Sequence, residues 1–489
     1  MRLRLPLILT IFGLAISLTT FSPVYSQVQG LEGTVGAEGR SYNVNGSTAK
    51  FHEYSDKTSG GLFGNVDLKY DSPGYFMQFL AADPGYDTQH YKLETGPYGK
   101  FKFSFDYNEI IHNITSDAKT FYSGAGSGTL TGAANTNPNS WNTFDYYTKR
   151  KKIDTGLKFD MARPFFFNVN YTNEKKEGIK PIGVSSTGSA GASLELPTPV
   201  DYRTNGLMLE GGYAKNPYFL SFNYYYNEFR NGTEDLNFTV PLGGVLSPLS
   251  LPPDNKYYKF ALKGSAKLPL NSKFSINLAD SKSTSDASIF TRFDGKVDTR
   301  NYDFNLTSNP LRFLDGKLYY KSYERNNKST GQILVSGIWT NTNPLYYKTD
   351  TLGAELGFRL PAKFYLNTGY KNVQTDRNVE NETNLALVLP KNTDNIYFAD
   401  LKWNGFDAIT PRVGFESLRR SADYQTSQSE AVYNRKFAYA AQNRDTIKAA
   451  VDLFPVDALN LGLEYRYKRT NYNDTALGFT DDTRNAFGF

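Results

Sequence analysis

The chain has 489 residues and a nearly balanced charge, with 54 Lys and Arg against 49 Asp and Glu. This balance gives no reason to expect nucleic acid as a partner, because nucleic-acid binding usually shows as a basic excess. The complete lack of cysteine excludes disulfides, thiolate nucleophiles, cysteine-ligated zinc and covalent haem attachment through Cys-x-x-Cys-His in this chain.

The first 26 residues have the pattern of a secretory signal. Arg2 and Arg4 precede an apolar run over 7–18, and small or medium-sized residues follow up to Ser26. We therefore expect residues 1–26 to be a signal peptide cleaved after Ser26, which leaves 52 basic and 49 acidic residues. The alternative, an uncleaved anchor, is disfavoured because the apolar run is shorter than the ~20 residues that span a bilayer.

A strand pattern follows a Gly-rich stretch at 27–48, which we expect to be a periplasmic lead-in. The first expected strands are 51–54 and 62–70, and the clearest hairpin covers 203–230, with its turn at 215–217. In that hairpin apolar and aromatic residues alternate with polar ones. Side chains two residues apart share a face of a strand, so one face is apolar and the other largely polar. The same alternation recurs to the end of the chain.

Aromatic residues are unusually abundant, with 36 Tyr, 35 Phe and 3 Trp making 15% of the chain. Beyond the signal, no apolar run approaches the length of a membrane-spanning helix. High aromatic content with alternation is typical of a transmembrane β-barrel, whose lumen-facing residues stay polar. We therefore predict an all-β protein in which residues 49–489 form a transmembrane antiparallel β-barrel of about 20 strands. The alternative is a secreted β-sandwich or β-helix.

The connections between the expected strands fall into two alternating classes. Short turns contain proline, and long segments are rich in Gly, Ser, Thr and Asn; the long segments are 109–141, 176–199, 229–254, 281–295, 325–344, 378–392 and 421–442. Outer-membrane barrels have short periplasmic turns and long extracellular loops. The alternation therefore predicts an integral protein of the outer membrane of a Gram-negative cell, with membrane lipid around it.

Charged residues on the strands predict the polar face. A charge on the lipid face near mid-membrane costs ~2–4 kcal/mol, so these residues should point inward. The lumen-facing candidates are Lys100, Lys102, Asp106, Asp303, Glu355, Arg359, Glu464, Arg466 and Lys468. Their presence implies a lumen that is filled with water or with protein.

No stretch of the sequence predicts a catalytic, cofactor-binding or metal site. Its only three histidines are His52, His90 and His112, and none has a nucleophile placed beside it in the sequence, as catalysis would require. This disfavours an outer-membrane hydrolase. We expect no cofactor in this chain.

Two segments resemble the MtrB/PioB family of outer-membrane β-barrels. The first covers 87–132 and contains Tyr98-Gly99-Lys100-Phe101, Asp106-Tyr107-Asn108-Glu109-Ile110 and Thr120-Phe121-Tyr122-Ser123-Gly124 before a Gly-Ser loop. The second runs from Gly462-Leu463-Glu464-Tyr465-Arg466-Tyr467 to Leu477-Gly478-Phe479-Thr480-Asp481-Asp482-Thr483, a strand and an Asp-Asp turn.

The resemblance implies a function. Members of the family form a sheath through the outer membrane for a multihaem c-type cytochrome, which carries electrons between periplasm and cell exterior. The expected partner is therefore such a cytochrome, which would supply the haems that this chain has no cysteines to attach. The sequence departs from some members in lacking a Cys-x-x-Cys near the mature N-terminus, and members usually have more strands after the Asp-Asp turn. The alternatives are a diffusion porin or transporter, and more remotely an enzyme or an adhesin.

Overall fold

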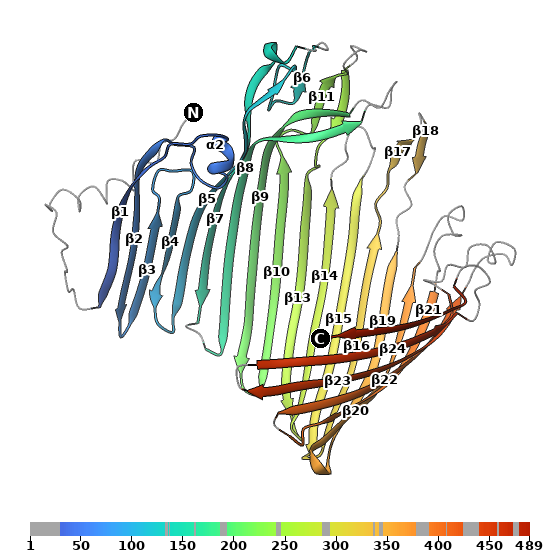
Figure 1. Cartoon of the computed structure of the whole chain (residues 1–489). Coiled ribbons are helices and arrows are strands. Elements are labelled where there is room, and N and C mark those ends of the chain that lie inside the picture. The colour runs from blue at the N-terminus through green and yellow to red at the C-terminus, as the bar shows by residue number, and fades with distance from the viewer. Residues whose placement is uncertain are drawn as a thin grey trace.

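A computed structural model gives the architecture of the chain (Figure 1). It describes residues 30–132, 135, 137–160, 163–185, 193–240, 246–285, 294–335, 338–341, 346–377, 391–406, 408–423, 440–456, 459–472 and 479–489. The expected signal peptide, 1–26, lies outside the described residues.

One antiparallel sheet of 20 strands dominates the structure. Its strands, in chain order, are β1 (Leu31–Ser41), β2 (Gly60–Ser72), β3 (Tyr75–Ala82), β4 (His90–Pro97), β5 (Phe101–Thr120), β7 (Asn142–Phe159), β8 (Phe165–Ser185), β9 (Ser193–Lys215), β10 (Tyr218–Asn231), β13 (Asn255–Leu268), β14 (Ser272–Ser285), β15 (Gly295–Leu311), β16 (Leu314–Asn327), β19 (Tyr347–Leu360), β20 (Phe364–Asp376), β21 (Lys391–Trp403), β22 (Ile409–Asp423), β23 (Gln442–Val456), β24 (Leu459–Asn471) and β25 (Asp481–Gly488). This confirms the all-β prediction and the count of about 20 strands.

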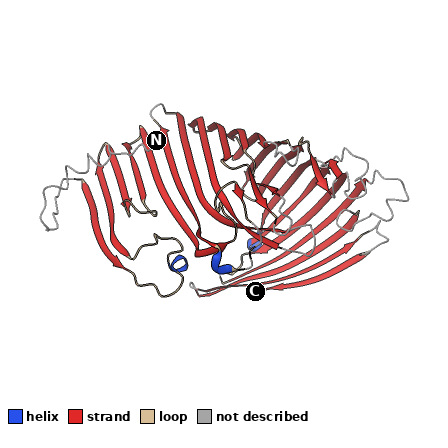
Figure 2. Ribbon diagram, turned by 90° about the horizontal axis from the view of Figure 1, so that it is seen from above, coloured by secondary structure: helices blue, strands red, loops and turns tan. Residues whose placement is uncertain are grey.

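Between its two edges, each strand of the sheet pairs with the strand before it and the strand after it, as in a chain of hairpins. The sheet curls strongly, so that β20 to β25 cross in front of the middle strands (Figure 1) and the whole has a curved wall when seen from above (Figure 2). β1 and β25 are its two edge strands. Among the described pairings neither edge strand bonds to the other. None of the described helices is long and apolar enough to cross a membrane.

The remaining elements lie in the connections. Two small sheets join β6 (Thr129–Leu130), β11 (Asp235–Thr239) and β12 (Leu246–Ser250), and β17 (Gln332–Val335) with β18 (Ile338–Asn341). The helical turns are α2 (Thr48–Phe51), η1 (Pro138–Ser140) and η2 (Pro361–Lys363). Except for η2, which lies in a short turn, these elements occupy long connections, so short turns and elaborated segments lie at opposite ends of the strands, as the sequence predicted.

The N-terminal boundary was predicted wrongly. The lead-in at 27–48 contains β1, which pairs with β2 from Leu31 opposite Tyr70 to Ser41 opposite Gly60. A ladder of backbone hydrogen bonds does not require large side chains, so a Gly-rich stretch with weak alternation can still form a strand.

The prediction of a strand at 51–54 is also wrong, because α2 ends at Phe51 and a turn follows at 52–54. The Ser47 side chain caps this short helix by accepting a hydrogen bond from the backbone N–H of Lys50 at 3.3 Å. A serine in this position satisfies one of the free N–H groups of the first turn.

The segment 176–199, expected to be a loop, mostly continues the sheet. β8 and β9 pair all the way from Phe165 opposite Tyr213 to Ser185 opposite Ser193. The hairpin therefore rises well beyond the ~25 Å apolar band of a membrane barrel. Above the membrane it packs against other connections in a small hydrophobic core formed by Tyr122, Leu130, Leu196, Leu236, Phe238 and Leu251.

Candidate functional site: the polar inner wall

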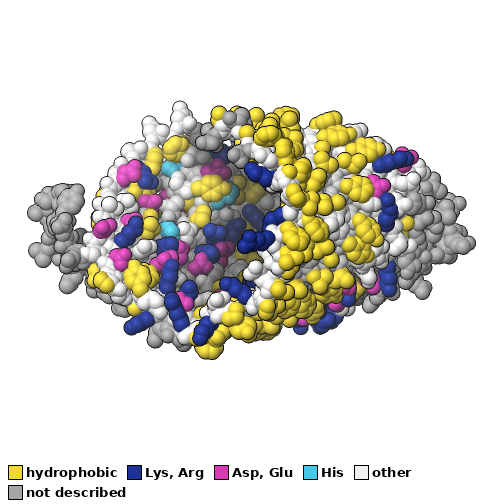
Figure 3. Space-filling view, turned by 90° about the horizontal axis from the view of Figure 1, so that it is seen from below, with side chains coloured by type: hydrophobic (Ala, Val, Ile, Leu, Met, Phe, Trp, Pro, Cys, Tyr) yellow, Lys and Arg dark blue, Asp and Glu magenta, His cyan; other side chains and the backbone are white. Residues whose placement is uncertain are grey.

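The two faces of the main sheet differ in the way that the alternation predicts. On one face large apolar side chains are open to the surroundings: Leu352 is 52% exposed, Phe222 50% and Leu463 55%. Residues directly opposite one another in adjacent strands share a face. Followed from strand to strand, the register places many charged residues of β4 to β24 together on the other face, while others, such as Asp280, Arg300 and Asp350, share the apolar face toward the ends of the strands at the long connections. We call this face the inner wall. Seen from below, charged side chains of both signs line a hollow (Figure 3).

Eight of the nine residues that the sequence predicted to face the lumen lie on the inner wall: Lys102, Asp106, Asp303, Glu355, Arg359, Glu464, Arg466 and Lys468. Lys100 does not lie on a strand. It ends the short turn before β5, where its backbone carbonyl accepts a hydrogen bond from the N–H of Asp160 at 2.7 Å.

In its N-terminal part, over β4, β5 and β7, the inner wall carries charges that neutralise one another. Glu94 accepts from Lys102 at 2.6 Å and lies 3.3 Å from the Lys92 ammonium. The remaining pairs are His90 with Asp106 at 3.2 Å and Lys152 with Asp154 at 2.8 Å. We call these seven residues the paired wall. The sequence predicted that Lys102 and Asp106 face the lumen, but their partners Glu94 and His90 come from β4, so only the register of the strands shows which charges meet.

Farther along the sheet, over β13, β14 and β16, the inner wall is different. Six basic residues lie on it: Lys259, Lys263, Lys267, Lys273, Lys321 and Arg325. Among the residues that the structure describes, none of the six forms an ion pair. We call these residues the basic stripe. None was among the sequence-predicted residues, although the spacing of Lys259, Lys263 and Lys267 at every fourth position places them on one face of a strand.

Between β16 and β24 acidic and basic residues are mixed. Lys317 donates to Glu355 at 3.1 Å, and Arg359 donates to Asp315 at 2.7 Å. Closer to the C-terminus Arg466 donates to Glu464 at 2.6 Å, and Lys468 lies 4.0 Å from Asp482. These contacts include five of the nine predicted residues. The side chains in each ion pair are partly open to water, so each pair stabilises the sheet by no more than about 1 kcal/mol.

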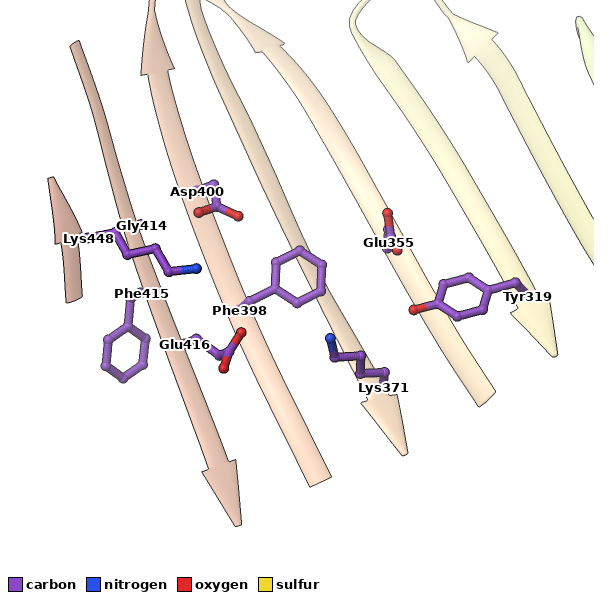
Figure 4. A pocket seen from close by; sticks show the side chains of 9 residues that line it. All are labelled: Tyr319, Glu355, Lys371, Phe398, Asp400, Gly414, Phe415, Glu416 and Lys448. Atoms are coloured by element: carbon purple, nitrogen blue, oxygen red, sulfur yellow. The ribbon is translucent and has the colours of Figure 1, made fainter. Parts of the chain in front are cut away.

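We call this part of the inner wall, between β16 and β24, the mixed wall. It contains two adjoining pockets of about 190 and 380 Å³, whose linings include Lys371, Lys402 and Lys448. Both are lined by Asp400, Gly414 and Lys448. Figure 4 shows the smaller of the two. Gly414 makes room for the carboxylate, since a Cβ at this position would lie 2.3 Å from Asp400 Oδ1. The smaller pocket is also lined by Glu355, Lys371 and Glu416. Its lining therefore carries charges of both signs and is not suited to one kind of ion.

At the extracellular end, the core around Tyr122 gives the long connections a fixed structure. Tyr122 is completely buried, and its hydroxyl donates to the carbonyl of Thr239 at 2.9 Å. Burial raises the pKa of Tyr122 to about 12, so the hydroxyl stays protonated and keeps this bond at any physiological pH.

The three histidines show no arrangement for catalysis. His90 belongs to the paired wall. The His52 ring nitrogen Nδ1 lies 3.0 Å from Ser55 Oγ, and His112 stacks on Tyr54 with Glu53 at 3.5 Å. Within the described part of the chain, no group of three or more His, Asp or Glu side chains is placed to hold a metal. The expectation that this chain carries no cofactor stays a prediction.

Comparisons with known proteins agree with this architecture. A family model described as "Putative outer membrane beta-barrel porin, MtrB/PioB" matches residues 43–489. Outer membrane protein MtrB of Shewanella baltica (strain OS185) is 25% identical, and the match covers 92% of this chain and 69% of that protein.

Solved structures of outer-membrane proteins are more distantly similar. BauA, the ferric preacinetobactin receptor of Acinetobacter baumannii, has a TM-score of 0.40 at 12% identity, covering 94% of this chain and 70% of BauA. The copper transporter OprC has a TM-score of 0.40 at 8% identity, covering 94% of this chain and 71% of OprC. At such low scores these likenesses do not bear on function.

Proposed function

Because the chain belongs to the MtrB/PioB family of outer-membrane β-barrels, we propose that it is a sheath that holds a multihaem c-type cytochrome across the outer membrane. The cytochrome would carry electrons between the periplasm and the cell exterior. The chain itself is an integral protein of the Gram-negative outer membrane, of a porin-like family that is not a class of enzymes. In this proposal it performs no reaction of its own.

The width of the sheet supports the proposal. Barrels of 16–18 strands leave an aqueous channel and those of 22 strands hold a plug, so 20 strands lie in the range where a lumen admits a protein. Twenty strands at ordinary spacing and tilt would enclose a cylinder about 40 Å across, or about 30 Å inside the side chains. That is close to the diameter of a compact domain of about 100 residues.

The composition of the chain is compatible with this division of labour. A haem-carrying protein needs cysteines for covalent attachment, and this chain has none, so the haems of the complex would all belong to the partner. The inner wall, with charges of both signs, is suited to a protein surface. A water-filled porin lumen can be charged as well, and the description of the matching family as a porin favours that second function.

The experiment that separates the two functions is gentle purification from the outer membrane. A sheath should bring with it a protein that stains for covalent haem. Liposomes carrying the complex should pass electrons to an enclosed redox dye, and liposomes with the barrel alone should not. A haem-free preparation that lets small solutes through would instead establish a porin.

A further inference from the structure

The basic stripe occupies one sector of the inner wall and is arranged in levels. Lys267 on β13 lies directly opposite Lys273 on β14. Four residues higher on β13 is Lys263, whose row continues through Asn277 and Asp303 to Lys321. The next level, with Lys259, ends at Arg325. Levels four residues apart are separated by about 13 Å along the strands.

The six basic residues of the stripe outnumber the single acid among them, which lies directly opposite Lys321. The acid within the stripe is Asp303, which accepts a hydrogen bond from Asn305 at 2.6 Å and forms no ion pair in the described part of the chain. The adjoining inner face of β10 is uncharged, with Ser221, Asn223, Tyr225 and Asn227. The side chains of the basic stripe are exposed, so their charge acts on whatever occupies the space in front of the wall.

The stripe does not stabilise the sheet. Like charges directly opposite one another are unfavourable, as at Lys267 and Lys273. A group of unneutralised cations on the wall of a confined space instead creates a positive potential that attracts and orients an anionic partner. The paired wall on β4, β5 and β7 creates no such potential, because its three carboxylates balance its three lysines.

We propose that the basic stripe binds an acidic patch on the surface of the protein held in the lumen and thereby fixes its rotation about the barrel axis. This inference rests on the proposed sheath function and adds to it the chemistry of the contact. Neither the paired wall nor the mixed wall offers an equivalent excess of positive charge, so one sector of the barrel selects one orientation of the partner.

Zero-length cross-linking tests the contact directly. A carbodiimide joins a lysine ammonium group to a carboxylate as an amide, with loss of water, when the two groups touch. Applied to the purified haem-containing complex, it should link Lys259, Lys263, Lys267, Lys273 or Lys321 to Asp and Glu residues of the haem protein, identified by mass spectrometry of the peptides. Links to the partner from Lys371, Lys402 and Lys448 alone, or none from the stripe, would overturn the proposal.

Two charge-matched variants complete the test. The first reverses three charges of the stripe, as Lys259→Glu, Lys263→Glu and Lys267→Glu. The second reverses three on the mixed wall, as Lys371→Glu, Lys402→Glu and Lys448→Glu. With both barrels present in equal amounts in the outer membrane, the stripe variant should retain about tenfold less haem per barrel than the unaltered protein, and the mixed-wall variant should retain it.

The outcomes separate this proposal from the function on which it rests. If the unaltered barrel carries no haem protein, the sheath function fails. If it carries one and both variants keep it or lose it equally, the sheath stands and the role of the stripe is disproved. If the unaltered barrel carries no haem protein in the outer membrane and its stripe variant loses a preference for anions, the stripe acts on small solutes, which also overturns the proposal.

Discussion

The paired wall and the basic stripe belong to the same sheet and face the same side, yet the charges of the first form ion pairs and those of the second do not. In the paired wall Glu94 lies between two lysines and Asp106 lies beside His90. In the stripe Lys267 faces another lysine. The charges of the paired wall form ion pairs within the barrel. The cations of the basic stripe form none in the described part of the chain and are available to a partner protein. An inner wall of mixed composition is therefore not uniform, and the pairing of its charges shows where a partner is expected to bind.

The largest effect should come from the face assignment on which this comparison depends. Phe222 is 50% exposed on the outer face of β10, and its neighbour Asn223 lies on the inner wall. Phe222→Lys puts a charge into lipid at a cost of ~2–4 kcal/mol near the mid-membrane, whereas Asn223→Lys puts it into the lumen. The amount of assembled barrel in the outer membrane should fall for Phe222→Lys and stay normal for Asn223→Lys. Equal yields would refute the assignment of the faces.

A smaller effect, of opposite sign in the two regions, should follow from removing single charges. Glu94→Gln removes the partner of both Lys92 and Lys102 and should destabilise the barrel by about 1 kcal/mol. Lys267→Gln relieves repulsion with Lys273 and should leave stability unchanged or raise it by a few tenths of a kcal/mol. Urea midpoints of the refolded barrel in detergent measure both. A loss of stability in both variants would mean that the stripe also stabilises the sheet.

The smallest effect should be on the ion preference of the barrel without its partner. Replacing Lys259, Lys263 and Lys267 by glutamine should reduce a preference for chloride over potassium in planar bilayers. Removing a neutral pair, as Lys152→Gln with Asp154→Asn, should leave the preference unchanged. The difference should shrink as salt is raised from 0.1 M to 1 M, because the Debye length falls from about 10 to about 3 Å. A preference that the stripe variant does not alter would show that its potential does not reach the permeating ions.

The sequence by itself determined the class of the fold and the faces of its strands. Alternation with period two is a local property, and contact with lipid on one side and with a polar lumen on the other imposes it on most of the strands. For this reason residues as far apart as Asp106 and Glu464 could be assigned to one face without knowledge of their neighbours. The family resemblance, which the match over residues 43–489 confirms, added what alternation could not, the expected partner.

Tertiary structure alone decided where the sheet begins and which charges meet. The pairing of β1 with β2 rests on backbone hydrogen bonds, so its Gly-rich sequence carried almost no signal. α2 depends on one serine cap. Whether a lysine faces an acid, as Lys102 faces Glu94, or another lysine, as Lys267 faces Lys273, is set by the register of neighbouring strands. A shift of one residue turns a side chain to the other face and a shift of two gives it a new partner, so no property of a single strand could have distinguished the paired wall from the basic stripe.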